Sequence, residues 1–353
     1  MAYLDANATE PLRPEARAAA IAALDLVGNP SSVHAAGRSA RRVLEEARAA
    51  IAGRYGAAPG SVVFTSGGTE ANALAIHALQ AGRRVILGAT EHDAVRAAAP
   101  GAVTLPVDAD GVADLDALAR LLAKGPALVC LMLANNETGT IQPIEAAAAL
   151  CRRHGALLHV DAVQAAGRIP VGLVGDSMAL SSHKLGGPKG AGALLLAPGS
   201  DVAPLVAGGG QERGRRGGTP ALPAIAGFAA AAAAPLPDLA GLRGLAEAAA
   251  VACGAVVLGG GHRLPNTSCL ALPGVRADTQ VIALDLAGVQ VSAGAACSSG
   301  KVANSHVLQA MGCGALAGQA IRVSLPWSAA MTDVAAFEAA YAGMAARLGK
   351  QAA

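Results

Sequence analysis

Short apolar runs alternate with segments of helical spacing between residues 62 and 196. The runs that predict strands lie at 62–64, 85–87, 103–107, 127–133, 156–160, 177–180 and 192–196. Apolar positions with helical spacing lie between several of them, at 70–80, 115–123 and 144–154. Apolar strands that alternate with helices are typical of a mostly parallel sheet covered by helices on both faces. We therefore predict an α/β fold.

The flanking regions complete a two-domain prediction. Helical spacing also occurs at 14–27, 38–54 and, as an alanine-rich stretch, at 221–235, and the composition shifts at Pro235-Leu236-Pro237. Beyond it, strands are expected at 255–258, 267–272 and 321–325, and helices at 279–286 and 334–348. We predict a large domain over 13–235 and a smaller α+β domain over 236–353. Residues 1–12 form a turn-rich segment that is expected to pack near the ligand site.

Ligands of such folds bind outside the carboxyl ends of the strands, so the residues that follow each strand are informative. Thr65-Ser66-Gly67-Gly68-Thr69-Glu70 directly precedes a helix, and its glycines and free N–H groups suit a phosphate. An ordinary helix cap at Thr69 explains the same pattern. His92 ends the next strand, where it is either a group that stacks on an aromatic cofactor or a surface residue.

Two later strand ends carry amides and a carboxylate. Asn135-Asn136-Glu137-Thr138-Gly139 could fix a substrate or form a simple turn. In His159-Val160-Asp161-Ala162-Val163-Gln164, Asp161 ends an apolar strand, where an unpaired carboxylate is costly. Asp161 therefore predicts a cationic partner at this edge of the sheet.

Lys184 provides the central hypothesis. It lies in Ser181-Ser182-His183-Lys184-Leu185-Gly186-Gly187-Pro188-Lys189-Gly190, one crossover and one strand after Asp161. A partly desolvated lysine can form a Schiff base with an aldehyde, although a lysine in such a loop is usually a solvated surface residue. We hypothesise that Lys184 carries pyridoxal 5'-phosphate (PLP). Asp161 would keep the ring nitrogen protonated, and Gln164 could reach the phenolic oxygen of the ring.

Composition narrows the class of protein. The chain has 353 residues, of which 53% are hydrophobic but only 2% aromatic, so its core must consist of aliphatic residues and alanine. The formal charge of +2 argues against a nucleic-acid or membrane surface held by net charge. The N-terminus has neither a basic nor an apolar leader region, so we expect no export and a cytoplasmic protein.

The cysteines favour a reduced compartment and single out one thiol. The six cysteines are scattered, with no CxxC pair and no cluster with histidine that would predict a metal site. Cys297 lies among small residues with Lys301 and His306 nearby, which suits a reactive thiol. Arg322, inside an apolar strand, needs a carboxylate from either the protein or a substrate.

Together these motifs resemble the cysteine desulfurases, the class V branch of the fold type I PLP enzymes. The resemblance runs from Tyr3 to Arg322. Its most specific pieces are Thr65-Ser66-Gly67-Gly68-Thr69-Glu70, Asn135-Asn136-Glu137-Thr138-Gly139, His159-Val160-Asp161-Ala162-Val163-Gln164, Ser182-His183-Lys184, Glu212-Arg213-Gly214-Arg215-Arg216-Gly217-Gly218-Thr219 and the Cys297 segment.

The resemblance implies a role for each matching residue. Lys184 would bind PLP, with His92 stacked on the ring and assisting proton transfer, Asp161 on the ring nitrogen and Gln164 on the ring oxygen. The phosphate would be bound by Gly68, Thr69, Ser181 and His183, and by Thr219 of the neighbouring subunit in a homodimer. Asn136 and Arg322, with help from Asn7, would hold the substrate carboxylate.

The resemblance also implies the reaction. L-Cysteine would be converted to L-alanine while Cys297 becomes a persulfide, whose sulfur passes to an acceptor protein for iron–sulfur cluster assembly or tRNA thiolation. The segment from Cys297 to Leu308 has the full length of the type specialised for iron–sulfur assembly. Neither nucleic acid nor membrane is expected as a direct partner.

Two departures and several alternatives stay open. Ala295 stands where the family commonly has serine, and Pro326-Trp327 follows the Arg322 strand where glycine and polar residues are usual. The alternatives are a selenocysteine lyase, another class V PLP aminotransferase or, more remotely, a non-catalytic sulfur-transfer scaffold. Cys297 discriminates, because an aminotransferase needs no thiol there. A P-loop nucleotide site at Gly67-Gly68 lacks its lysine and carboxylate.

Overall fold

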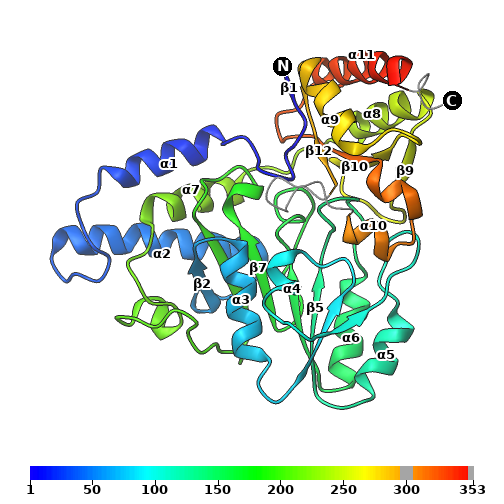
Figure 1. Cartoon of the computed structure of the whole chain (residues 1–353). Helices are drawn as coiled ribbons and strands as arrows, with labels where there is room; N and C mark the ends of the chain where they lie inside the picture. Colours follow the sequence, from blue (N-terminus) through cyan, green and yellow to red (C-terminus); the bar gives the residue numbers. More distant parts are fainter. Residues whose placement is uncertain (295–304, 349–353) are drawn as a thin grey trace.

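The computed structural model describes residues 1–294 and 305–348, and in this part of the chain two main sheets and a short two-stranded one carry the fold (Figure 1). The larger sheet has seven strands. They are β2 (Val62–Thr65), β3 (Arg84–Gly88), β4 (Val103–Leu105), β5 (Ala127–Met132), β6 (Leu157–Asp161), β7 (Ser177–Ser181) and β8 (Gly192–Leu196).

The large sheet has the order β2-β8-β7-β6-β5-β3-β4. The strands from β7 to β4 are parallel, whereas β8 runs antiparallel to both β7 and β2. All residues of β5, β7 and β8 are buried, as expected for strands covered on both faces. The predicted mostly parallel α/β sheet is confirmed.

Helices cover this sheet on both sides. They are α1 (Pro14–Leu24), α2 (Ala35–Tyr55), α3 (Gly68–Leu79), α4 (Asp93–Arg96), α5 (Leu115–Leu122), α6 (Ile144–Arg153) and α7 (Leu222–Ala233). The ends of α2 follow local chemistry: the His34 side chain accepts a hydrogen bond from the Gly37 N–H, and Gly56 ends the helix at a φ of 70°. Both α1 and α2 pack against α7, so the alanine-rich stretch is a helix of the large unit.

The smaller sheet is antiparallel, in the order β12-β13-β10-β9. Its strands are β9 (Val256–Leu258), β10 (Thr267–Ala271), β12 (Ser292–Ala293) and β13 (Ala320–Ser324). The helices of this region are α8 (Ala240–Ala252), α9 (Ala277–Leu286), α10 (His306–Ala310) and α11 (Met331–Leu348). The small α+β unit is thus present, and α7 and α8 lie on either side of residues 235–237. The exact division at residue 235 stays a prediction.

The N-terminal segment joins the two units. β1 (Ala2–Tyr3) pairs in parallel with β11 (Val289–Gln290), and Asp5 forms a bridge with Ser324 of β13. The backbone N–H of Glu10 then donates to the carbonyl of His183 in the large unit. Short 3-10 turns complete the elements: η1 (Pro59–Ser61), η2 (Ser182–Lys184), η3 (Gln211–Gly214) and η4 (Gly314–Gly318).

The helices of this part of the chain are too short or too polar for a membrane span. Among residues 1–294 and 305–348, no helix combines the length and the apolar character that are needed to cross a bilayer.

Candidate active site

A cavity opens at the carboxyl ends of β6 and β7. Its lining includes most of the residues singled out from the sequence, contributed by several loops and by the first turn of α3. These residues are Gly68, Thr69, His92, Asn136, Asp161, Gln164, Ser181, His183 and Lys184. Residues that lie more than 100 positions apart in the chain therefore share one site.

Strand register explains why Lys184 and Asp161 meet. β6 and β7 are parallel neighbours, with Asp161 paired with Ala179, and Lys184 ends η2 directly after β7. The Lys184 Nζ donates hydrogen bonds to the carbonyl oxygens of Asn7 and Ala8, the latter at 3.0 Å. The amine therefore lies at the sheet edge between the Asp161 strand and the N-terminal segment.

The start of α3 packs closely against the cavity wall and would form a cradle for an anion. Gly68 is the first residue of α3, and a Cβ atom there would lie 2.7 Å from Val163 Cγ2 and 3.3 Å from Ser181 Cβ. Glycine is thus required for the helix N-terminus to approach the cavity. His183 stands beside this cradle, and burial together with the positive charges of Lys184, Lys189 and Arg168 lowers its pKa to about 4. It is therefore neutral at pH 7 and offers one N–H group.

The His92 side chain is held by a backbone N–H of the helix that it caps. It is the N-cap of α4, and its Nδ1 accepts a hydrogen bond from the Ala94 N–H at 3.1 Å. The preceding residue, Glu91, is buried and accepts a hydrogen bond from the Met132 N–H at 2.7 Å. Burial raises the Glu91 pKa well above its usual value, although the Met132 N–H bond acts in the opposite direction. The turn that presents His92 to the cavity is therefore anchored on β5.

Arg322 is bonded to the protein itself. Its side chain is buried, its Nη2 lies 2.7 Å from Asp5 Oδ1, and its Nη1 donates to the Asn136 carbonyl at 3.3 Å. It does not line the cavity, whereas Asn136 does. Of the two partners that the sequence left open for this arginine, the structure supplies a protein carboxylate.

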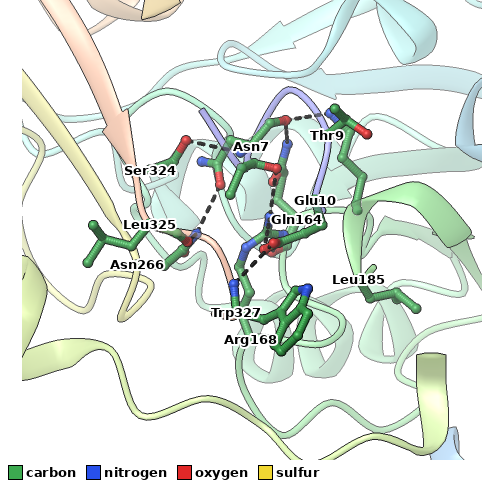
Figure 2. Close-up of polar contacts among 12 residues, drawn as sticks. Asn7, Thr9, Glu10, Gln164, Arg168, Leu185, Asn266, Ser324, Leu325 and Trp327 are labelled. Carbon is green, nitrogen blue, oxygen red and sulfur yellow. Dashed lines mark hydrogen bonds and ion pairs between the residues drawn. The ribbon is translucent and has the colours of Figure 1, made fainter. Parts of the chain in front are cut away.

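Asn7 lies at the centre of a polar network that Figure 2 shows from the N-terminal segment outward. Its side-chain amide donates to the Asn136 carbonyl and to Thr267 Oγ1, and its carbonyl accepts from Gln164 Nε2 at 3.0 Å. Nearby, Glu10 pairs with Arg168 at 3.4 Å. These contacts join Asn7 to the cavity residues Asn136 and Gln164, and the packing of residues 1–12 as a segment of the ligand site stays a prediction.

Three of the candidate residues that the structure describes, Asn7, Thr219 and Arg322, are not among those that line the cavity. Thr219 is exposed and lines a different pocket, together with Ser66 and Arg216. Cys297 lies outside the described residues, as does Ala295. Trp327, the other departure from the family pattern, donates from its indole nitrogen to the Pro11 carbonyl at 2.8 Å.

The sequence reasoning missed several residues that support the site. Asn72 lies one turn after Gly68 on α3, and His159 lies two residues before Asp161 on β6. These spacings place Asn72 on the same helix face as Gly68 and His159 on the same strand face as Asp161. Both could have been noted from periodicity, whereas the contact of Asp5 with Arg322 had no local signal.

Comparison with known proteins places this architecture in a family. The family model described as Aminotransferase class-V matches residues 2–239. The chain belongs to the class-V aminotransferase family. It is 45% identical over 333 residues to a cysteine desulfurase of Cereibacter sphaeroides, covering 88% of this chain and 86% of that one. It is also 38% identical to an IscS-like cysteine desulfurase of Mycobacterium tuberculosis, covering 98% and 97% of the two chains.

Solved structures agree with this placement. A NifS-like protein superposes with a TM-score of 0.90 at 33% identity, covering 99% of this chain and 100% of that one. A structure titled SspA in complex with cysteine superposes with a TM-score of 0.81 at 29% identity, covering 92% and 99%. These values confirm the resemblance and the fold class predicted from the motifs.

The family implies PLP as cofactor, and the residues of the cavity fit such a group. The glycine cradle at α3 suits a phosphate, and Asp161 suits a protonated ring nitrogen. In addition, Gln164 Oε1 is buried and has no hydrogen-bond partner among the described residues. Such an orphaned acceptor in a cavity wall is expected where a bound ligand supplies the missing partner.

Proposed function

We propose that this chain is a PLP-dependent cysteine desulfurase that converts L-cysteine to L-alanine and carries the sulfur as a persulfide on Cys297. The observation that carries the proposal is the convergence of the Lys184 amine, the Asp161 carboxylate and the N-terminus of α3 on one cavity. The relatives named cysteine desulfurase, and the solved relative titled as a complex with cysteine, support this substrate.

The cavity residues divide into those that would hold the cofactor's ring and those that would hold its phosphate. Lys184 would bind the aldehyde carbon, His92 would cover the ring, and Asp161 and Gln164 would face the ring nitrogen and oxygen. The phosphate would lie against Gly68, Thr69, Ser181 and His183. When bound, PLP supplies an electron sink for charge that develops on the substrate's α-carbon.

The chain's own groups would then move protons and sulfur. The freed Lys184 amine would take the α-proton, and the Cys297 thiolate would attack the sulfur of the substrate. The substrate's carbon–sulfur bond would break with its electron pair left on carbon, which takes a proton and leaves as alanine. The sulfur would stay on Cys297 as a persulfide. Asn136 and Arg322 would hold the substrate carboxylate, which requires Arg322 to share its guanidinium with Asp5.

We also propose a homodimer and a protein sulfur acceptor. Thr219 is exposed and separate from the Lys184 cavity of its own chain, which is compatible with a role in a neighbouring subunit's phosphate site. The persulfide sulfur would pass to an acceptor for iron–sulfur cluster assembly or tRNA thiolation.

The test compares wild type with Cys297→Ala and Lys184→Ala after incubation with PLP and L-cysteine. Wild type should release alanine and gain the mass of one sulfur atom on the peptide that contains Cys297. Cys297→Ala should keep the visible absorbance of bound cofactor but form neither persulfide nor alanine. Lys184→Ala should lack that absorbance band. Mass spectrometry and a visible spectrum read these outcomes.

Cys313→Ala is the matched control, because Cys313 is a partly buried thiol elsewhere in the small unit. It should behave like wild type. Alanine release that is undiminished in Cys297→Ala would refute the nucleophile assignment. Formation of an oxo acid in place of alanine would favour an aminotransferase, and a strong preference for selenocysteine would favour a lyase.

A further inference from the structure

A row of buried polar side chains runs from Asp161 into the interior, away from the cavity. Asn72 Nδ2 lies 2.8 Å from Asp161 Oδ2, and Asn72 Oδ1 lies 2.8 Å from His159 Nε2. His159 Nδ1 in turn lies 2.8 Å from Ser177 Oγ. Asn72 is 1% exposed, and His159 and Ser177 are fully buried. The row joins α3, β6 and β7: Asn72, like Asp161, lines the cavity, whereas His159 and Ser177 do not line it and are fully buried.

The chemistry of the partners determines where each proton lies. An ionised Asp161 can only accept, so the Asn72 amide must present its NH₂ group to it and its oxygen to His159. That oxygen can only accept, so His159 Nε2 must carry a proton. Burial lowers the His159 pKa to about 4, so the neutral ring has no proton on Nδ1 and accepts from the Ser177 hydroxyl. Every hydrogen bond of the row therefore points toward Asp161.

The row completes the bonding of a single carboxylate. Asp161 Oδ2 receives the Asn72 amide, and Oδ1 receives the Val163 N–H at 2.9 Å. Two donors, one on each oxygen, orient the carboxylate plane. Burial raises the pKa of the nearby carboxyl group of Glu91 well above its usual value. Asp161 therefore presents a carboxyl group of fixed orientation to the cavity.

We propose that Asn72 and His159 are positioning residues, which hold Asp161 as an oriented carboxylate through the directional chain Ser177 to His159 to Asn72 to Asp161. The inference rests on the proposed function, because the orientation matters only if a cationic ring nitrogen binds to Asp161. Neither residue would touch the reacting atoms. They would act on how firmly Asp161 binds the cofactor ring.

The chain offers a matched pair of substitutions. In His159→Gln the side-chain amide reaches the position of Nε2 and can still donate to Asn72, whereas in His159→Asn the amide reaches only the position of Nδ1. Both remove the ring and leave a similar gap, so a purely structural role predicts similar effects. Asn72→Ala removes the amide that donates to Asp161. It serves as the reference for complete loss of this hydrogen bond.

The first measurement is the release of PLP from the purified holoproteins, read as the loss of visible absorbance after dilution. His159→Asn and Asn72→Ala should release PLP about tenfold faster than wild type, with a shifted absorbance maximum, because the Asp161 carboxylate has lost a donor. His159→Gln should stay close to wild type in both readouts. Equal release rates and spectra in all four proteins, or equal effects of the Gln and Asn variants, would overturn the proposal.

The second measurement is made on the wild-type protein, and a variant serves only to assign the signal. Wild-type protein labelled with ¹⁵N-histidine should show His159 as the neutral tautomer that is protonated on Nε2, assigned by the signal missing from His159→Gln. A tautomer protonated on Nδ1, or a charged ring, would overturn the proposal even if His159→Asn or Asn72→Ala fails to fold. If the wild-type protein binds no PLP, the proposed function is refuted. The tautomer measurement would then still report the direction of the hydrogen bonds in the row.

Discussion

At the scale of single residues, Glu137 is a buried acid whose ionisation opposes folding. Its carboxylate accepts a hydrogen bond from Ser305 Oγ at 2.6 Å, and a Cβ on Gly294 would lie 2.8 Å from its Oε2. Burial raises its pKa to about 7, although the Ser305 bond and the charge of Arg322 act in the opposite direction. Glu137 thus contacts the two described residues that flank positions 295–304.

Replacing Glu137 by Gln should make stability less sensitive to pH. The unfolded carboxyl ionises near 4.5 and the folded one near 7, so wild type loses stability from this group as the pH rises through that range. The variant does not lose this stability, because a glutamine amide does not ionise. Its free energy of unfolding should therefore rise relative to wild type by about 2–3 kcal/mol between about pH 5 and about pH 8, at ~1.4 kcal/mol per pKa unit.

Urea unfolding at a series of pH values measures this difference. Glu145→Gln is the control for loss of a carboxylate charge, because Glu145 is exposed in the first turn of α6. A difference between Glu137→Gln and wild type that stays constant across the pH range would contradict the prediction.

At the scale of elements, the N-terminal segment is fastened by contacts that lie far apart in the sequence. Glu10 Oε1 pairs with Arg168, its Oε2 accepts from the Trp327 N–H at 3.1 Å, and Arg13 stacks over the Trp327 ring at 4.7 Å (Figure 2 shows the first two contacts). The departure Pro326-Trp327 therefore secures the segment whose carbonyls face Lys184. The presence of Trp327 at this position thus has a structural reason that the sequence did not reveal.

Glu10→Ala should destabilise the protein by about 3 kcal/mol, because it leaves the buried Arg168 guanidinium without its carboxylate. Thermal or urea unfolding measures the loss. Glu15→Ala is the control, because Glu15 is half exposed and its carboxylate pairs with Arg13 at the long distance of 3.8 Å. The loss of this pair should change the free energy of unfolding by less than about 1 kcal/mol. Equal losses of unfolding free energy in the two variants would show that the buried Glu10–Arg168 pair stabilises the protein no more than the half-exposed Glu15–Arg13 pair does.

At the scale of the whole molecule, the proposed homodimer makes a prediction that subunit mixing can test. Within one chain, Thr219 and Lys184 line different pockets. If Thr219 completes the neighbouring subunit's phosphate site, a mixed dimer of Lys184→Ala and Thr219→Ala chains contains one intact site. Alanine release at limiting PLP should then be well above that of either variant alone. Activity no higher than the sum of the separate variants would place Thr219 outside a shared site.

Much of the fold could be predicted from periodicity. The strand expected at 127–133 is β5 (Ala127–Met132), because a continuous buried apolar run has few other solutions. Helix α8 (Ala240–Ala252) was missed, since Gly241 and Gly244 in an alanine-rich stretch weaken both helix propensity and amphipathic spacing. Its packing against α11 compensates for this weakness.

The candidate site was predictable where it depends on strand ends. Lys184, Asp161 and Gly68 could be grouped from the order of strands and loops alone, because parallel strands deliver their carboxyl ends to one edge of a sheet. The partner of Arg322 could not be chosen, since a buried guanidinium accepts a carboxylate from protein or ligand alike. Asp5 became that partner through the isolated bridge that it forms with Ser324 of β13.

By itself the sequence determined the order of strands and helices and the set of polar residues at one sheet edge, since hydrophobic period and turn chemistry are local properties. Only the tertiary structure decided that Asn7 and Ala8 face Lys184 and that the Ser177 to Asn72 row lies behind Asp161. These contacts join residues from separate elements, and which elements meet depends on how the two sheets and the N-terminal segment pack together.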